Sequence, residues 1–233
     1  MKPLIVIPAR GGSKGVPRKN IKVLGDKPLI QYTIDAAKGV FDDEFICVST
    51  DDFEIKSVVE NLGLKVPFLR PNELAADTSG TYEVLLHAIS HYESEGYFPD
   101  TLIILQPTSP FRTSKHIQAA LDLYQEELDM VVSVKETKSN PYYILFEEDR
   151  NGYLKKTKEA NFTRRQDCPK VWEYNGAIYI INVKALKEKT ISQFTKVCKF
   201  EMDETSSHDI DTLLDWRIAE IIINDKENDR YKE

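Results

Sequence analysis

The sequence is poor in cysteine and lacks any long hydrophobic run. Its three cysteines, among 233 residues, have neither CxxC spacing nor an even count, so they argue against a disulfide framework and favour a reducing compartment. The apolar run at the amino terminus is too short for a signal peptide, and no later run approaches the length of a membrane span. We therefore expect a cytoplasmic protein with no membrane partner.

Two common nucleotide-binding signatures are also missing. The sequence contains neither GxxxxGK[ST] nor GxGxxG, which argues against a P-loop and against a dinucleotide-binding fingerprint. Its four histidines have no ligand grouping. His87 and His91 lie one turn apart on a predicted helix, and we interpret them as a packed or solvated pair rather than as metal ligands.

The acidic balance of the chain is uneven. It carries 31 lysines and arginines against 38 aspartates and glutamates, a formal net charge of −7. Residues 1–25 contain six of the basic residues and no acidic one, so 25 basic residues face 38 acidic ones in the remainder. This asymmetry argues against a nucleic-acid partner and indicates one local anion site near the amino terminus.

Short apolar runs alternate with segments of helical periodicity along most of the chain. Strands separated by helices of about ten to fifteen residues are typical of parallel βαβ units. We therefore predict an α/β fold with a doubly wound, mostly parallel, Rossmann-like sheet, in a single domain over residues 1–233. The predicted strands are 3–7, 44–50, 101–106, 130–134 and 176–182. The predicted helices are 29–41, 52–63 and 212–226, with two more where apolar residues recur over 82–89 and 117–128.

Residues 137–172 interrupt this rhythm. They predict a small hairpin that turns near Asn151 and Gly152, with Tyr142, Ile144 and Phe146 at alternate positions. An isolated two-stranded ribbon is marginal in water, so the hairpin must pack against something. Two interpretations stay open, an edge hairpin on the parent domain and an inserted arm that packs on a second subunit.

The first candidate site is the stretch PARGGSKGVPRKN, residues 8–20, which follows the first predicted strand. Its glycines let backbone N–H groups approach an anion, and Arg10, Lys14 and Lys19 can add charge-assisted bonds to phosphate oxygens. Ligands of α/β proteins bind at this edge of the sheet. We therefore favour a phosphate-binding loop over a solvated surface turn.

The second candidate is the pair Asp209 and Asp211 in HDIDT. In an extended segment both carboxylates face the same way, and two hard oxygen ligands suit Mg²⁺ when water and phosphate complete its shell. The alternative is capping of the last helix, because acids are favoured there. The spacing alone leaves both open, and the phosphate-binding loop favours the metal.

Two polar loops are more ambiguous. In LQPTSPFR, residues 105–112, the side chains of Gln106, Thr108, Ser109 and Arg112 offer polar groups at the sheet edge. The alternative is a proline-stabilised connection with Thr113 or Ser114 as helix cap. Residues 70–83 are either a base-binding loop or a loop whose Asp77, Thr78 or Ser79 caps the next helix.

Taken together and in this order, five stretches resemble the acylneuraminate cytidylyltransferases, the CMP-sialic acid synthetases. They are IPARGGSKGVPRKN, RPNELAADTSGT, ILQPTSPFRT, YNGAIYI and DIDTLLD, and the likeness runs from residue 5 to about residue 220. The resemblance implies a nucleotidyltransferase fold, Mg²⁺ as cofactor, and a homodimer in which each subunit extends an arm over its neighbour's site. The implied reaction moves CMP from CTP to the anomeric hydroxyl of a nonulosonic acid and releases pyrophosphate.

By the same resemblance, each quoted stretch carries implied site residues. Arg10, Lys14, Lys19 and Asn20 would hold the triphosphate and nucleoside, while Arg70 and Thr81 would contact the cytosine side. Gln106 would touch the sugar acid, and Arg165 would pair with its carboxylate from the arm. Asp209 and Asp211 would carry the metal. Arg10, Lys19 and Asp211 are the predicted catalytic residues.

One departure from the family pattern concerns the acceptor sugar. Some bacterial sialic acid enzymes have a basic residue shortly before NGAIYI, where this chain has Glu173 and Tyr174. The acceptor is therefore open between N-acetylneuraminate, its deaminated analogue and a diacetamido relative such as legionaminate. Two rival functions remain as alternatives, an NDP-sugar pyrophosphorylase and a non-catalytic nucleotide-binding module.

Overall fold

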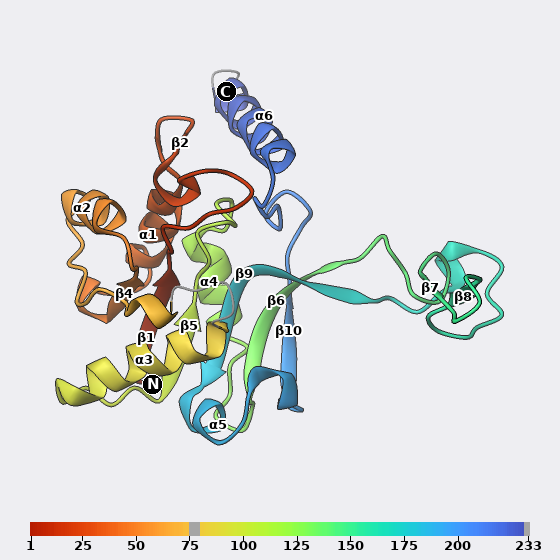
Figure 1. The fold of residues 1–233 in the computed structure, drawn as a ribbon, viewed down its shortest axis with the longest axis horizontal. Coiled ribbons are helices and arrows are strands. Elements are labelled where there is room, and N and C mark those ends of the chain that lie inside the picture. The colour runs from red at the N-terminus through yellow and green to blue at the C-terminus, as the bar shows by residue number, and fades with distance from the viewer. Residues whose placement is uncertain (75–79, 231–233) are drawn as a thin grey trace.

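A six-stranded mixed sheet forms the centre of the protein (Figure 1). The structure is a computed structural model that describes residues 1–74 and 80–230. The strand order is β10-β6-β9-β5-β1-β4. The strands are β1 (Pro3–Pro8), β4 (Ile46–Ser49), β5 (Thr101–Ile104), β6 (Met130–Glu136), β9 (Trp172–Asn182) and β10 (Val197–Glu201). All neighbouring pairs are parallel except those of β9, which runs antiparallel to β5 and β6. The prediction of a mostly parallel sheet is confirmed, and β10 is a strand that the sequence did not indicate.

Helices cover both faces of the sheet, as a doubly wound fold requires. They are α1 (Leu29–Lys38), α2 (Phe53–Asn61), α3 (Thr81–Ser94), α4 (Ser114–Leu121), α5 (Val183–Glu188) and α6 (Leu213–Arg230). Alternate residues of β1 feed two core clusters, with Ile5 and Ile7 packing beside α1, α2 and α4. Leu4 and Val6 pack with α3 and α5 on the other face. Because β1 is buried on both faces, its sequence is a continuous apolar run.

Several helices are shorter than predicted. The apolar stripe over 117–128 belongs to a helix that ends at Leu121. Tyr124 and Leu128 still pack against the core, but from the connection that follows the helix. The first helix likewise ends at Lys38 instead of Phe41, and no helix in the described ranges is long and apolar enough to cross a membrane.

Two small antiparallel ribbons stand outside the main sheet. β2 (Val23–Leu24) and β3 (Lys27–Pro28) turn at Gly25, whose φ of 65° favours glycine. β7 (Phe146–Glu148) and β8 (Leu154–Lys156) form the predicted hairpin, which pairs with no strand of the main sheet. This arm projects from the ends of β6 and β9 (Figure 1). Tyr142 and Ile144 precede β7 and are not strand residues.

Candidate active site

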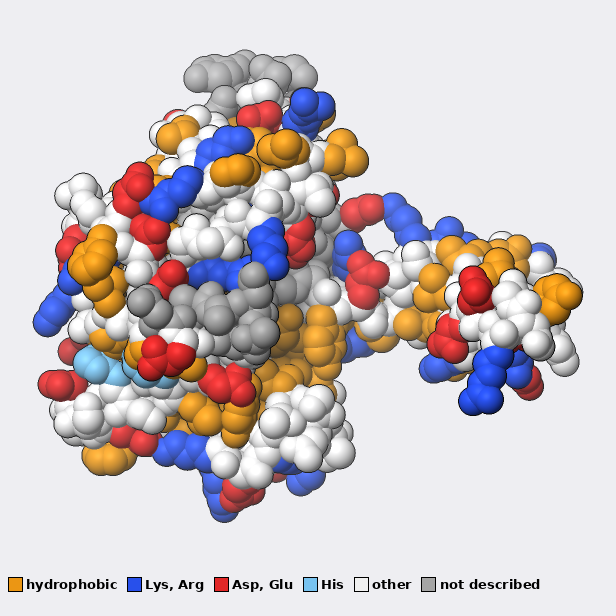
Figure 2. Space-filling model, viewed as in Figure 1, with side chains coloured by type: hydrophobic (Ala, Val, Ile, Leu, Met, Phe, Trp, Pro, Cys, Tyr) orange, Lys and Arg blue, Asp and Glu red, His pale blue; other side chains and the backbone are white. Residues whose placement is uncertain are grey.

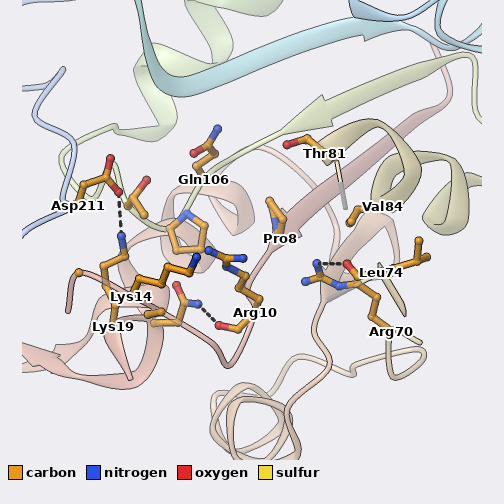
Figure 3. Close-up of a pocket in the computed structure, with 16 residues that line it drawn as sticks. Pro8, Arg10, Lys14, Lys19, Arg70, Leu74, Thr81, Val84, Gln106 and Asp211 are labelled. Carbon is orange, nitrogen blue, oxygen red and sulfur yellow. Dashed lines mark hydrogen bonds and ion pairs between the residues drawn. The ribbon is translucent and has the colours of Figure 1, made fainter. Parts of the chain in front are cut away.

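A cavity of about 350 Å³ opens at the edge of the sheet where β1 and β5 end (Figure 3). The carboxyl ends of parallel strands are where α/β proteins bind ligands. The cavity brings together eight of the predicted site residues, which are Arg10, Lys14, Lys19, Asn20, Arg70, Thr81, Gln106 and Asp211. These residues come from four separate parts of the sequence, so the fold alone has gathered them.

The opening loop is fixed to the last motif by a close backbone approach. A Cβ on Gly15 would lie 1.8 Å from the backbone oxygen of Asp211, so only glycine fits there. Lys19 Nζ donates to the Ile210 oxygen at 2.5 Å. It also donates to Asp211 Oδ1 at 3.1 Å (Figure 3). Asn20 Nδ2 donates to the Arg10 oxygen at 2.9 Å, which holds the start of the loop. These contacts hold the loop in place at both ends, while Gly12, Lys14 and Pro17 between them are exposed.

Arg18, which has no predicted role, braces the loop from outside the cavity. Its φ of 56° lies in the left-handed region, and its guanidinium pairs with Asp52 at 2.6 Å and also with Glu54. Asp52 in turn caps α2 through the N–H groups of Glu54 and Ile55. The neighbouring Asp51 accepts from the Gly11 N–H at 3.2 Å. These acids after β4 were missed by sequence reasoning, and their position directly after a buried strand was the available signal.

The loop reads GGSKG at residues 11–15, which matches the GxSxG spelling of a nucleophile elbow. Such an elbow needs a helix directly after the serine and a histidine partner. Here the next helical residues after β1 are Lys19–Ile21, and no histidine is among the described residues that line the cavity. The loop therefore matches the sequence pattern of a nucleophile elbow but not its structure.

Arg70 forms the opposite wall of the cavity with Leu74, Thr81 and Val84 (Figure 3). Its side chain is 6% exposed and donates to the Ser49 oxygen at 2.7 Å and to the Leu74 oxygen at 3.4 Å. Burial lowers the pKa of Arg70. Its Nε has no hydrogen-bond partner among the described residues.

Helix α3 begins beside this wall, with Gly80 as its N-cap. The alternative caps Asp77, Thr78 and Ser79 lie outside the described residues.

The loop after β5 divides its polar groups between the cavity and the core. Gln106 and Thr108 line the cavity, whereas Arg112 does not reach it and is 2% exposed. Arg112 donates to the backbone oxygens of Gln106 and Ala177, the latter at 2.9 Å, and burial lowers its pKa to about 9. The expectation that Arg112 faces the crevice is wrong, because its guanidinium braces the loop from behind.

The connection after this loop ends in a helix cap, which is one of the two alternatives predicted from the sequence. Thr113 caps α4, accepting from the His116 N–H at 3.4 Å.

The two aspartates of HDIDT line different cavities. Asp211 lines the first, while Asp209 lines an adjoining cavity of about 370 Å³ that also contains Gln106. The expectation that both carboxylates face the same way is therefore met only in part. Burial raises the pKa of Asp209, and the charge of Asp211 raises it further. The cap of α6 is made by Thr212 and Asp215, which exchange hydrogen bonds at 2.7 and 3.3 Å.

Asn175 anchors the segment that carries Asp209 and Asp211. Asn175 Nδ2 donates to Ser207 Oγ at 2.8 Å, and its Oδ1 accepts from Ser133 at 2.6 Å. The next residue, Gly176, has a φ of 74°, which glycine adopts easily. The Asn-Gly pair inside a strand pattern was the signal for this irregularity.

Two predicted features lie away from the cavities. Arg165 begins a short 3-10 helix on the arm and is exposed, and it lines neither cavity of its own chain. His87 and His91 both contact the ring of Phe68, with centroids 4.7 Å apart in each case. Burial lowers the pKa of His87, as expected for a packed pair.

A basic glycine-rich loop with Asp211 in the same cavity, at the carboxyl edge of an α/β sheet, is the arrangement expected of a nucleotidyltransferase. The comparison with known proteins narrows this class. The chain belongs to the cytidylyltransferase family, whose sequence profile matches residues 4–221. This confirms the resemblance seen in the sequence.

Three known proteins illustrate the relationship. The N-acylneuraminate cytidylyltransferase of Streptococcus agalactiae is 37% identical over 93% of this chain and 52% of its own length. The CMP-N,N'-diacetyllegionaminic acid synthase of Legionella pneumophila is 34% identical over 94% of this chain and 95% of its own. The chain thus spans about half of the first relative and nearly all of the second. The solved CMP:2-keto-3-deoxy-manno-octonic acid synthetase complexed with CTP shares the fold, with a TM-score of 0.73, 18% identity and coverage of 97% of this chain and 100% of that one.

Proposed function

We propose that the chain transfers CMP from CTP to the anomeric hydroxyl of a nonulosonic acid and releases pyrophosphate. The observation that carries this proposal is the pair of adjoining cavities, one basic and one containing Asp209, that share Gln106. A nucleotide and a sugar acid bound side by side would place the hydroxyl next to the α-phosphate. Family membership and the named relatives support the same assignment.

On the nucleotide side, Arg10, Lys14 and Lys19 hold the triphosphate together with the loop amides. Three cations offset the charge that grows on the leaving pyrophosphate, which makes Arg10 and Lys19 catalytic in the sense of charge stabilisation. The nucleoside then lies between Asn20 on the loop and the opposite wall, where Arg70 and Thr81 contact the cytosine side. Both Arg70 and Thr81 line this wall.

Asp209 and Asp211 fit Mg²⁺. Their carboxylates are hard oxygen ligands. Burial and, to a smaller extent, the charge of Asp211 raise the pKa of Asp209, and a cation between the two carboxylates would offset both effects. No group of three or more His, Cys, Asp or Glu side chains in the described ranges could hold an ion alone, so water and phosphate oxygens would complete the shell. When bound, Mg²⁺ supplies charge neutralisation and polarisation of the phosphate.

The reaction needs little covalent help from the protein. The hydroxyl oxygen forms a bond to the α-phosphorus in line with the bond that breaks, pyrophosphate leaves with that electron pair, and the hydroxyl proton passes to water. Positioning by Gln106 and charge stabilisation by the loop account for the catalysis.

The arm completes the site in a homodimer with exchanged arms. Arg165 would then reach the acceptor carboxylate of the neighbouring subunit. The arm exposes apolar side chains to solvent (Figure 2), namely Ile144, Leu145, Phe146, Tyr153 and Leu154. Such a ribbon is marginal alone and gains stability from a covering surface.

A pyrophosphate-release assay tests this function. With Mg²⁺ and N-acetylneuraminate or diacetyllegionaminate, we expect release from CTP at a rate far above that from UTP, GTP or ATP. Release that requires a sugar 1-phosphate would point instead to an NDP-sugar pyrophosphorylase. Binding of CTP without release in any combination would reduce the chain to a nucleotide-binding module.

A further inference from the structure

The second cavity has a charged wall made by neighbouring strands. Lys135 near the end of β6 and Glu173 near the start of β9 are direct cross-strand partners. Lys135 Nζ and Glu173 Oε1 are 2.9 Å apart, and the two side chains are 34% and 43% exposed. Both line the cavity that holds Asp209 and Gln106. The pair is therefore preformed and within reach of a molecule bound there.

The charges around this cavity favour one role for the lysine. Among the described residues that line it, Asp209 and Glu173 are acids and Lys135 is the only lysine or arginine. An anionic acceptor that enters between two carboxylates loses water and meets repulsion unless a cation receives it. Resting on the function proposed above, we infer that Lys135 binds the carboxylate of the acceptor sugar acid from within the same chain.

Glu173 acts as the residue that positions Lys135. The Thr137 hydroxyl and Lys135 lower the pKa of Glu173 against the opposing effect of burial, so it is ionised at neutral pH. An ammonium has three donors, and one contact with Glu173 leaves others for a ligand. On the far side, the pair borders a groove that repels an anion, because the acids there outnumber Lys138; they are Glu136, Glu201, Asp203 and Glu204. The acceptor carboxylate is thereby directed to the Gln106 side.

The test compares the KM for the acceptor with the KM for CTP in the full chain. The acceptor is the nonulosonic acid that the unmodified protein turns over fastest in the presence of Mg²⁺. Lys135→Met keeps most of the stem and removes the charge, and we expect it to raise the acceptor KM by about tenfold to a hundredfold, as loss of a charge-assisted bond does. The KM for CTP should stay within about twofold. Lys135→Arg should recover most of the acceptor affinity, and Glu173→Gln should raise the acceptor KM by several-fold.

Two controls separate this role from a general effect on structure. Lys138→Met removes a lysine from a similar ion pair, Lys138–Glu204, whose Nζ–Oε1 distance is 2.5 Å on the exposed surface, and it should change neither KM. The methyl ester of the acceptor lacks the carboxylate charge. The unmodified protein should prefer the acid over the ester, and Lys135→Met should reduce this preference by about the factor by which it raises the acceptor KM, because Arg165 of the partner subunit still pairs with the carboxylate.

The outcomes distinguish the two proposals. An unchanged acceptor KM and an unchanged preference for the acid in folded Lys135→Met would overturn the role of Lys135 while leaving the reaction intact. Absence of pyrophosphate release by the unmodified protein with every nonulosonic acid would overturn the reaction and, with it, this inference. If Lys135→Met fails to fold, Lys135→Arg and Glu173→Gln still decide the matter through the same two KM values.

Discussion

Substitution of Gly15 by alanine isolates the contact between the opening loop and the last motif. The added Cβ would lie 1.8 Å from the Asp211 oxygen, well inside the separation at which carbon and oxygen pack. The backbones must therefore move apart by more than about 1 Å. The same movement pulls Lys19 Nζ away from the Ile210 oxygen, from which it is 2.5 Å distant.

A misplacement of this size has a predictable cost. A displacement of about 1 Å lowers a rate by about a hundredfold when the chemistry depends on positioning. Overpacking of this kind also destabilises a fold by about 1–3 kcal/mol, which lowers the melting temperature by several degrees in a domain of this length. We expect Gly15→Ala to reduce kcat/KM for CTP by about a hundredfold, and the measurements are steady-state pyrophosphate release and thermal melting.

Gly12→Ala is the matched control in the same loop. A Cβ at Gly12 would meet nothing within 4 Å, and its φ is not in the left-handed region. Gly12 does not line the cavity, so the activity of the Gly12→Ala variant should stay within about twofold of that of the unmodified protein. If Gly15→Ala shows the turnover and CTP affinity of Gly12→Ala, the reasoning that joins the loop to the DIDT segment is refuted.

Three further predictions concern the metal pair, the loop lysine and the stability of the sheet edge. Asp211→Ala should lower turnover by several orders of magnitude with the fold intact, and near-normal turnover in saturating Mg²⁺ would contradict its metal role. Lys19→Ala should weaken CTP binding selectively, as measured by titration, and unchanged CTP affinity would return the loop to a surface turn. The Asp129 carboxylate accepts from the Lys196 and Thr195 N–H groups and pairs with Lys189, which lowers its pKa to about 2. Because the folded pKa lies below the unfolded value, this stabilisation is present above about pH 4 and is lost as the pH falls from about 4 to 2. Asp129→Asn should therefore lower the free energy of unfolding by about 2 kcal/mol at pH 7, with a smaller difference at pH 3, and equal melting curves at pH 7 would contradict it.

The parts of the fold that the sequence predicted are those with a local signature. β1 and β5 are buried on both faces, so each is a short continuous apolar run. β10 has no such run, because Val197–Glu201 forms an edge strand whose side chains are half-buried or exposed. The direction of β9 was also not predictable, since it depends on the arm that separates it from β6.

The candidate site shows the same difference between features with a local sequence signature and features that depend on distant residues. The opening loop and Asp211 were predicted from residue type and position along the chain. Arg112 was misplaced because its burial depends on the backbone oxygen of Ala177, 65 residues away, which no local pattern reveals. The sequence did not predict the ion pair of Lys135 and Glu173, because this pairing depends on the register of two strands separated by the arm.

Transfer of CMP from CTP to a nonulosonic acid is measured most directly by mass spectrometry of the products. CTP labelled at the α-phosphate would be incubated with Mg²⁺ and, in turn, N-acetylneuraminate, its deaminated analogue and diacetyllegionaminate. We predict a labelled CMP-sugar acid with at least one of them, and one pyrophosphate for each molecule formed. Label that stays in CTP with every acid, or that leaves only as free CMP, would contradict the account.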